Sequence, residues 1–189
     1  ADYRALHRWS VEEPGAFWDL LWDFGGIIGD KGSRQVENGD AMPGARFFPD
    51  ATLNYAENLL RRDDDGEAIV FQREDGETRR VSWRQLNALV SRLQQALLAA
   101  GVKPGDRVAG YLPNIPEAIA ALLATASIGA VWSSASPDFG VDGVLDRFGQ
   151  IEPVVLIAAD GYFYAGKTID LSDKIRAIDQ RLGNIKASI

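Results

Sequence analysis

The sequence predicts an α/β fold in which helices flank a largely parallel, doubly wound sheet. Two observations lead to this prediction. From residue 67 onward, strand and helix patterns alternate with short turns between them. The segment 154–159 is a continuous apolar run, which is typical of a strand buried on both faces. Hydrophobic residues make up 46% of the 189 residues, which is enough for a packed core.

The first 62 residues precede this alternation and predict a helical and extended arm. Residues 1–9, which hold His7, are polar and of mixed charge, so we expect them to be mobile. Glu12, Glu13 and Pro14 indicate a helix start, and an aromatic-rich pattern then runs to Gly25. We expect these aromatics to pack within the fold, with a partner interface as the alternative. Residues 29–51 predict an extended loop, and 53–61 a short helix.

The elements after residue 62 can be predicted in order. Strands 68–71 and 78–81 flank Asp75–Gly76, the turn signal of a β-hairpin. A long helix starts at Ser82, whose spacing to Gln85 fits a capping box, and Gly101 supplies its left-handed cap. The remaining pattern predicts strand 107–112, helix 115–129, strand 130–133, helix 141–150, strand 154–159 and helix 171–182.

Composition excludes several classes of function. The net charge is −7 and the basic residues are scattered, so we expect no nucleic-acid partner. There is no cysteine, which rules out disulfides, zinc–thiolate sites and a cysteine nucleophile, and His7 is the only histidine. The most apolar run, 118–132, is too short to span a bilayer, and no signal peptide is visible. We therefore expect no membrane partner, no metal site and a cytoplasmic location.

One segment formally satisfies the Walker A pattern of nucleotide-binding P-loops. Residues 161–168 read Gly-Tyr-Phe-Tyr-Ala-Gly-Lys-Thr, with Lys167 and Thr168 in the phosphate- and magnesium-binding positions. Three consecutive aromatic residues crowd the turn, however, and Asp170 or Ser172 is the expected N-cap, which starts the helix too late. We expect no P-loop here, and a small P-loop triphosphatase is kept as the alternative.

The polar segment 133–140 is a second candidate. It lies between a predicted strand and a predicted helix, where open parallel sheets bind ligands. A loop that merely caps the helix through Asp138 is an equal alternative. Asp142 and Asp146 are expected to complement the helix dipole rather than to act as an acid–base pair. For Arg147 we expect an ion pair with a neighbouring acid, with anion binding as the alternative.

Several of these segments together resemble the acyl-CoA synthetases of the adenylate-forming superfamily. The similar stretches are 17–18, 47–49 followed by 53–60, 101–108, and 111–118. Within that family, residues 132–140, 146–151 and 161–167 are most similar to the branch that ligates acetoacetate. The resemblance covers nearly the whole chain. It divides the chain into residues 1–62, the N-terminal arm, and residues 63–189, the first and incomplete part of the AMP-binding domain.

The resemblance implies a two-step ligation of acetoacetate, or a similar short acid, to CoA. ATP and Mg²⁺ would give an acyl-adenylate, from which the CoA thiol displaces AMP. It also implies CoA contacts at Lys167, Tyr164, Phe139 and Gly140. Tyr164 stands where relatives carry a basic residue, and Asp138 stands where they carry a glycine.

The family's ATP phosphate loop, its adenine-binding segment, its hinge and its catalytic lysine are not found in these residues. We therefore expect no catalytic residue in this chain, no bound cofactor and no activity of the chain alone. A second copy could cover a sheet edge or apolar face left exposed. Besides the triphosphatase, a non-enzymatic α/β binding module that docks a partner through its aromatic helix is kept as an alternative.

Overall fold

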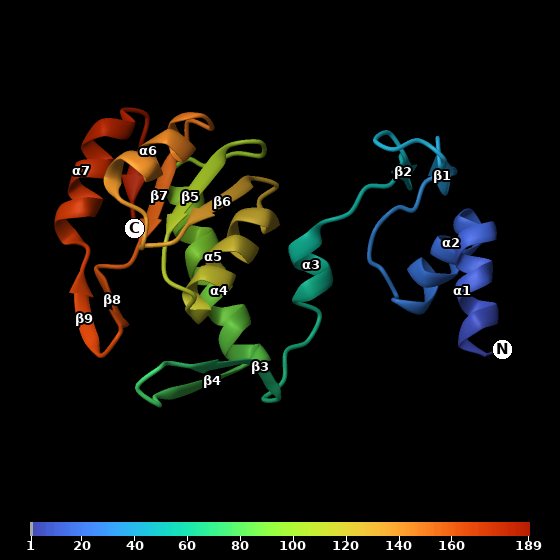
Figure 1. Ribbon diagram of the computed structural model, residues 1–189, viewed down its shortest axis with the longest axis horizontal. Helices are drawn as coiled ribbons and strands as arrows, with labels where there is room; N and C mark the ends of the chain where they lie inside the picture. The colour runs from blue at the N-terminus through green and yellow to red at the C-terminus, as the bar shows by residue number, and fades with distance from the viewer. Residues whose placement is uncertain (1) are drawn as a thin grey trace. The chain divides into compact units, whose positions relative to one another are not determined.

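A computed structural model describes residues 2–189, which fold into two compact units. One unit extends as far as Asn54 and the other from Tyr55 to Ile189 (Figure 1). The N-terminal unit contains α1 (Tyr3–Glu12), α2 (Pro14–Phe24), and an antiparallel pair, β1 (Val36–Glu37) with β2 (Arg46–Phe47).

Helix α1 corrects the expectation of a mobile segment for residues 3–9, whereas Ala1 lies outside the described residues. The side chain of Asp2 caps the helix by accepting a 2.8 Å hydrogen bond from the amide of Ala5. A capped helix can form from polar residues because the cap satisfies an amide that would otherwise lack a partner. His7 lies exposed on α1, and its backbone carbonyl accepts a 2.7 Å hydrogen bond from the Ser10 hydroxyl.

The aromatic residues of the N-terminal unit pack mainly on one another. The ring of Trp18 lies edge-on to those of Phe17 and Phe47, with centroids 5.4 and 5.6 Å apart. The ring of Trp22 is tilted against that of Phe48, with centroids 5.0 Å apart. These contacts join α2 to the loop around β2, so they support the prediction that the aromatic pattern packs within the fold.

The second unit follows the predicted alternation closely. Its helices are α3 (Tyr55–Leu59), α4 (Trp83–Ala99), α5 (Pro116–Ser127), α6 (Val141–Gly149) and α7 (Ser172–Leu182). Its strands are β3 (Glu67–Gln72), β4 (Thr78–Ser82), β5 (Arg107–Tyr111), β6 (Val131–Ala135), β7 (Val155–Ala158), β8 (Gly161–Tyr164), β9 (Lys167–Asp170) and β10 (Ala187–Ser188). The capping box at Ser82 and Gln85 is present in both directions.

Four strands form one parallel sheet in the order β10-β7-β5-β6. Strand β5 pairs with β6 on one side and with β7 on the other, which makes it central. The hairpin β3–β4 is a separate two-stranded sheet, and so is the hairpin β8–β9. Strands β8, β9 and β10 were not predicted from the sequence.

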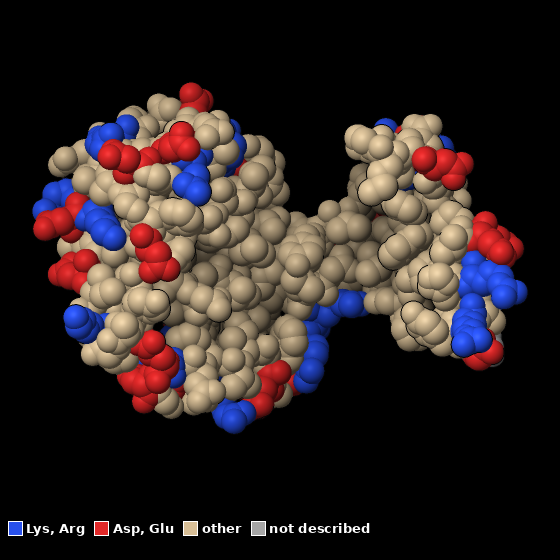
Figure 2. Space-filling view, in the orientation of Figure 1, with Lys and Arg blue, Asp and Glu red and all other residues tan. Residues whose placement is uncertain are grey.

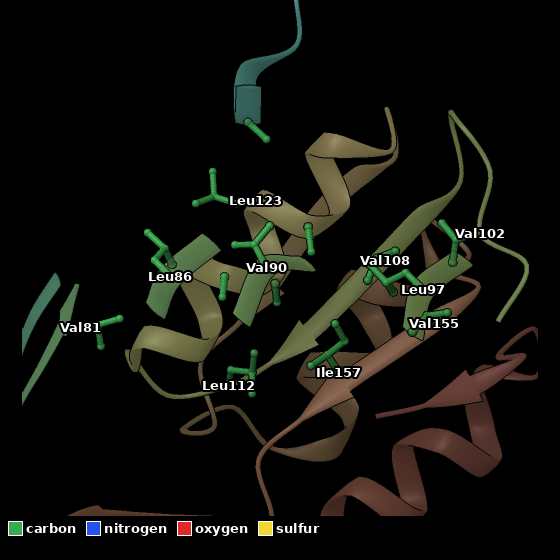
Figure 3. Packing of buried hydrophobic residues seen from close by; sticks show 14 residues of the cluster. Val81, Leu86, Val90, Leu97, Val102, Val108, Leu112, Leu123, Val155 and Ile157 are labelled. Atoms are coloured by element: carbon green, nitrogen blue, oxygen red, sulfur yellow. The ribbon is translucent and has the colours of Figure 1, made fainter. Parts of the chain in front are cut away.

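Each face of the parallel sheet is covered by its own layer of helices, as a doubly wound fold requires. Val108 and Val155 point into a core shared with α4 and α5, where Leu86, Val90 and Leu123 pack (Figure 3). Their neighbours Ala109 and Leu156 point to the opposite face and pack with α6 and α7, through residues that include Phe148 and Ile178. The period-2 alternation of strands explains why one apolar run serves both cores.

None of the helices within residues 2–189 is both long enough and apolar enough to cross a membrane.

Candidate functional site

Three strands of the parallel sheet end side by side, and the polar segments singled out in the sequence follow them. Strands β5, β6 and β7 end at Tyr111, Ala135 and Ala158. The segment 136–140 leaves β6, and the β8–β9 hairpin leaves β7 after two residues. In open α/β sheets ligands bind at the carboxyl ends of the strands, so this edge is the candidate site.

The loop 136–140 is fixed to the sheet by buried contacts. Tyr111 is fully buried, and its hydroxyl lies 2.9 Å from the carbonyl oxygens of both Pro137 and Phe139. From α7, the ammonium group of Lys174 lies 3.4 Å from the same Pro137 carbonyl. A buried tyrosine hydroxyl needs a polar partner, and this loop supplies it.

Asp138 does not cap helix α6, contrary to one of the two alternatives. The N-cap residue is Gly140, and no side chain caps the helix there. Instead the Asp138 carboxylate accepts a 2.9 Å hydrogen bond from the Tyr162 hydroxyl on β8 and another, also 2.9 Å, from Ser136. Asp138 therefore links the loop to the hairpin rather than to its own helix.

The Walker-like segment forms an antiparallel hairpin and not a phosphate-binding loop. Tyr164 and Lys167 face each other across a two-residue turn, Ala165–Gly166, in which φ is 50° and 74°. Positive φ at both central residues is the geometry of a type I′ hairpin turn. Gly161 is packed so closely that an added Cβ would lie 2.7 Å from the Ile169 carbonyl oxygen.

Helix α7 starts at Ser172, so Lys167 and Thr168 lie in a strand rather than at a helix N-terminus. The late start agrees with the sequence analysis, although the N-cap residue is Leu171 rather than Asp170 or Ser172. The side chain of Asp170 still accepts a 2.7 Å hydrogen bond from the Ser172 amide. Amides paired across a hairpin cannot converge on a phosphate, so the structure does not favour the triphosphatase.

The two faces of the β8–β9 hairpin meet different surroundings. Tyr162, Tyr164 and Lys167 share one face, because Tyr164 and Lys167 are directly paired and alternate residues of a strand lie on one side. The rings of Tyr162 and Tyr164 are 6.5 Å apart. Tyr164 is 57% exposed, and Lys167 makes no ion pair within residues 2–189. Its ammonium is therefore available to an anion.

Phe139 and Arg147 form the other part of the edge. The guanidinium carbon of Arg147 lies 4.0 Å from the centre of the Phe139 ring, and one of its nitrogens donates to the Gly143 carbonyl at 2.9 Å. Within the described residues, Arg147 makes no ion pair with an acid, so that expectation was wrong. The ring draws the cation by a cation–π contact instead. The neighbouring Asp142 pairs with Arg181 of α7.

On the opposite face of the hairpin lies a cleft of about 610 Å³. Its walls are the β3–β4 hairpin, residues 113–115 and the start of β8. Arg73 stacks on Phe163 at 5.2 Å, and the amide of Gly166 donates to Glu74 at 3.1 Å. These contacts join the tips of the two hairpins, so β8–β9 is held from both sides.

Tyr111 and Tyr162 are held in their neutral form. Burial raises the pKa of the Tyr111 hydroxyl, and the nearby Asp138 charge adds to that effect. Burial also raises the pKa of Tyr162, reinforced by its hydrogen bond to Asp138. A neutral phenol is the form that donates a hydrogen bond, so both contacts hold at neutral pH.

The surface over α7 and the β8–β9 hairpin carries side chains of both signs. Figure 2 shows Lys and Arg interspersed with Asp and Glu over this part of the molecule. Arg176 pairs with Asp173 at 2.9 Å, within α7 itself. The cations of the candidate site are therefore few and local, at Lys167, Arg147 and Lys174. No group of three acidic or histidine side chains within residues 2–189 could hold a metal ion.

The structure brings together residues that the sequence analysis had treated separately. Phe139 and Gly140 lie in the loop, Tyr164 and Lys167 lie in the hairpin, and Asp138 and Tyr162 connect the two. The sequence analysis missed the roles of Tyr111, Tyr162 and Lys174. For Tyr111 a signal existed, because a tyrosine that ends a buried central strand must place its hydroxyl against a polar partner.

Comparison with known proteins shows to which family this chain is similar. Residues 56–188 match the AMP-binding enzyme family, and residues 3–59 match the acetyl-coenzyme A synthetase N-terminus. An acetoacetyl-coenzyme A synthetase of Rhizobium meliloti (strain 1021) is 56% identical over 97% of this chain. A malonamoyl-CoA synthetase of Penicillium aethiopicum is 38% identical over 99% of it. The chain spans about 28% of the length of the first and 27% of the second.

A solved acetoacetyl-CoA synthetase from Streptomyces lividans has the same fold. Its TM-score is 0.91 and its identity 46%, over 100% of this chain and 30% of that one. The family match covers more than half of the chain, and it includes the whole sheet and both hairpins. The chain therefore belongs to the AMP-binding enzyme family, in which it is similar to the N-terminal part of acetoacetyl-CoA synthetases.

Proposed function

We propose that this chain forms the N-terminal part of an acid–CoA ligase that converts acetoacetate, ATP and CoA to acetoacetyl-CoA, AMP and diphosphate. The observation that carries the proposal is the combination of family membership with 56% identity to an acetoacetyl-coenzyme A synthetase. In this reaction the carboxylate first forms an acyl-adenylate, because a free carboxylate is a poor acyl donor to a thiol and AMP is a good leaving group. The CoA thiol then attacks the acyl carbon, and AMP leaves.

The role proposed for this chain is to hold the nucleotide end of CoA. Lys167 supplies an exposed ammonium with no ion pair in residues 2–189, which suits a phosphate. Tyr164 adds an exposed hydroxyl beside it, and Phe139 offers a ring that is 38% exposed. Gly140 has open space where a side chain would stand, so a ligand can approach its backbone. When bound, CoA supplies the thiol nucleophile of the second step.

Other parts of the reaction lie outside these residues. The ATP phosphates, Mg²⁺ and the acid are proposed ligands of the complete enzyme, and this chain alone is expected to be inactive. The acid itself is supported only by the relatives, one of which is a malonamoyl-CoA synthetase. We keep the division at residues 62 and 63, the cytoplasmic location and the self-association of an exposed sheet edge as predictions.

The ligase reaction tests the proposal directly. The protein encoded by the complete reading frame is incubated with acetoacetate, MgATP and CoA, and acetoacetyl-CoA, AMP and ADP are separated by chromatography. We expect acetoacetyl-CoA and AMP in equal amounts, and no ADP. The 189-residue chain alone should give neither product. Formation of ADP, or no CoA thioester from the complete protein, would contradict the proposal.

A pair of lysine variants tests the assignment within the chain. Lys167→Ala should raise the KM for CoA by roughly 5- to 100-fold and leave the KM for acetoacetate unchanged, as expected for loss of one charged contact. Lys103→Ala is the matched control, because Lys103 is exposed and precedes β5 at the opposite edge of the sheet. Equal KM values for CoA in the two variants would remove Lys167 from the site.

A further inference from the structure

The proposed coenzyme contacts lie on two segments that have different origins in the fold. Phe139 and Gly140 belong to the loop after β6, whereas Tyr164 and Lys167 lie at the tip of the β8–β9 hairpin. A two-stranded hairpin by itself is only marginally stable, and this one is not part of the parallel sheet. Something must therefore fix the distance between the two segments.

Asp138 and Tyr162 make the direct side-chain contact between them. The Tyr162 hydroxyl donates a 2.9 Å hydrogen bond to one carboxylate oxygen of Asp138, and Ser136 donates to the other at 2.9 Å. A hydrogen bond to a carboxylate is stronger than one between neutral groups. The acceptor is fixed in its turn, because Tyr111 and Lys174 hold the carbonyl of Pro137, the residue before Asp138.

The position of Tyr162 makes the contact effective. Tyr162 shares a hairpin face with Tyr164 and Lys167, and its ring lies 6.5 Å from that of Tyr164. On the opposite face, the Gly166 amide bonds Glu74 and Phe163 contacts Arg73. The hydrogen bond to Asp138 therefore sets which way the face that carries Tyr164 and Lys167 is presented.

We propose that Asp138 is a positioning residue, which through Tyr162 holds the β8–β9 hairpin at a fixed spacing from the loop 136–140, so that both segments contact one coenzyme molecule. The identity of the ligand, CoA, rests on the proposed function, whereas the contact between Asp138 and Tyr162 does not. It gives a role to an aspartate that is not explained by helix capping. Asp138 touches no reacting atom and acts through Tyr162.

Hydrogen–deuterium exchange of the 189-residue chain tests the contact without any ligand. Asp138→Ala and Tyr162→Phe should each speed exchange of the amides of residues 162–169 by about 3- to 10-fold, the equivalent of one hydrogen bond. The double variant should match the single variants, because both remove the same bond. Asp138→Asn keeps an acceptor and should have a smaller effect. Tyr55→Phe, which removes an exposed hydroxyl on α3, should leave these amides unchanged.

Kinetics of the protein from the complete reading frame test the purpose of the contact. Tyr162→Phe and Asp138→Ala should raise the KM for CoA by about 3- to 10-fold, by the same reasoning, while kcat and the KM for acetoacetate stay unchanged. Unchanged exchange in both variants would overturn the proposal, and so would faster exchange with an unchanged KM for CoA. If the parent protein forms no acetoacetyl-CoA, the proposed function fails, and the exchange rates alone decide whether Asp138 holds the hairpin.

Discussion

The hydroxyl of Tyr111 donates a hydrogen bond of 2.9 Å to the carbonyl oxygen of Phe139, which ties the end of the central strand to the loop before α6. The same hydroxyl lies at the same distance from the Pro137 carbonyl. Tyr111 has no exposed surface, so this contact replaces solvent for both partners. A loop held in this way can present Phe139 and Gly140 in one conformation.

Removing this hydroxyl should destabilise the protein. Tyr111→Phe keeps the ring and its packing but leaves the Phe139 carbonyl without its buried donor and the Pro137 carbonyl with Lys174 alone. The expected loss is about 1 to 3 kcal/mol in the free energy of unfolding, the cost of unsatisfied buried polar groups. Urea denaturation followed by tryptophan fluorescence measures it. Tyr55→Phe is the control, and a Tyr111→Phe midpoint equal to that of the control would contradict the assignment.

The same tyrosine predicts a loss of stability at alkaline pH. Burial raises the pKa of Tyr111 above its ordinary value of 10.0, so the unfolded chain gives up this proton at a lower pH than the folded protein does. The folded state then binds more protons than the unfolded state, and stability falls as pH rises. The contribution is fully present below pH 10 and is lost above it. Thermal unfolding between pH 8 and 11 should show a shallower decline for Tyr111→Phe than for the parent chain.

Substitutions at the two central residues of the hairpin turn should change the stability of the hairpin in opposite directions. Ala165 has a φ of 50°, which disfavours a residue with a Cβ, so Ala165→Gly should stabilise the hairpin by about 0.5 to 1 kcal/mol. Gly166 has a φ of 74°, so Gly166→Ala should destabilise it by about 1 kcal/mol. Exchange rates of the amides in residues 162–169 report both. Changes of the same sign would argue against a type I′ turn.

The absence of a P-loop geometry predicts the response to nucleotide. A P-loop that binds MgATP would stabilise the fold by about 2.7 kcal/mol at a hundredfold excess over Kd, and Lys167→Ala would abolish that gain. Because Lys167 lies in a strand, we expect no shift of Tm with millimolar MgATP in either protein. A shift in the parent chain that is absent in Lys167→Ala would restore the triphosphatase alternative.

The face of the sheet under α6 should be the more sensitive part of the core. Phe148 is fully buried among residues of α6, α7 and the sheet, so Phe148→Ala should cost about 3 to 5 kcal/mol. Phe24, at the end of α2, is 87% exposed, and Phe24→Ala should change stability by less than about 0.5 kcal/mol. Chemical denaturation of both variants measures the contrast. Similar losses of unfolding free energy in the two variants would contradict the expected dependence on burial.

Local chemistry made much of the fold predictable. The capping box at Ser82 and Gln85, the turn at Asp75–Gly76 and the apolar run of β7 each act through neighbours in the sequence or through a simple period. The N-terminal helix α1 was missed because its polar, mixed-charge composition is typical of a mobile segment, although Tyr3, Leu6 and Trp9 recur at a helical spacing and Asp2 caps the helix. The β8–β9 hairpin was missed because its turn is Ala165–Gly166 rather than Asn–Gly or Asp–Gly.

The sequence by itself determined the fold class, the family resemblance and the residues proposed for the site, because helix caps, turns, strand periods and the order of motifs are local or linear properties. Only the tertiary structure decided which contacts Asp138 and Arg147 make, and that Lys167 lies in a strand. Asp138 bonds Tyr162, 24 positions later in the chain, rather than its own helix, and Arg147 stacks on Phe139. Such contacts depend on where the carboxyl ends of separate strands meet, and the parallel sheet sets that geometry.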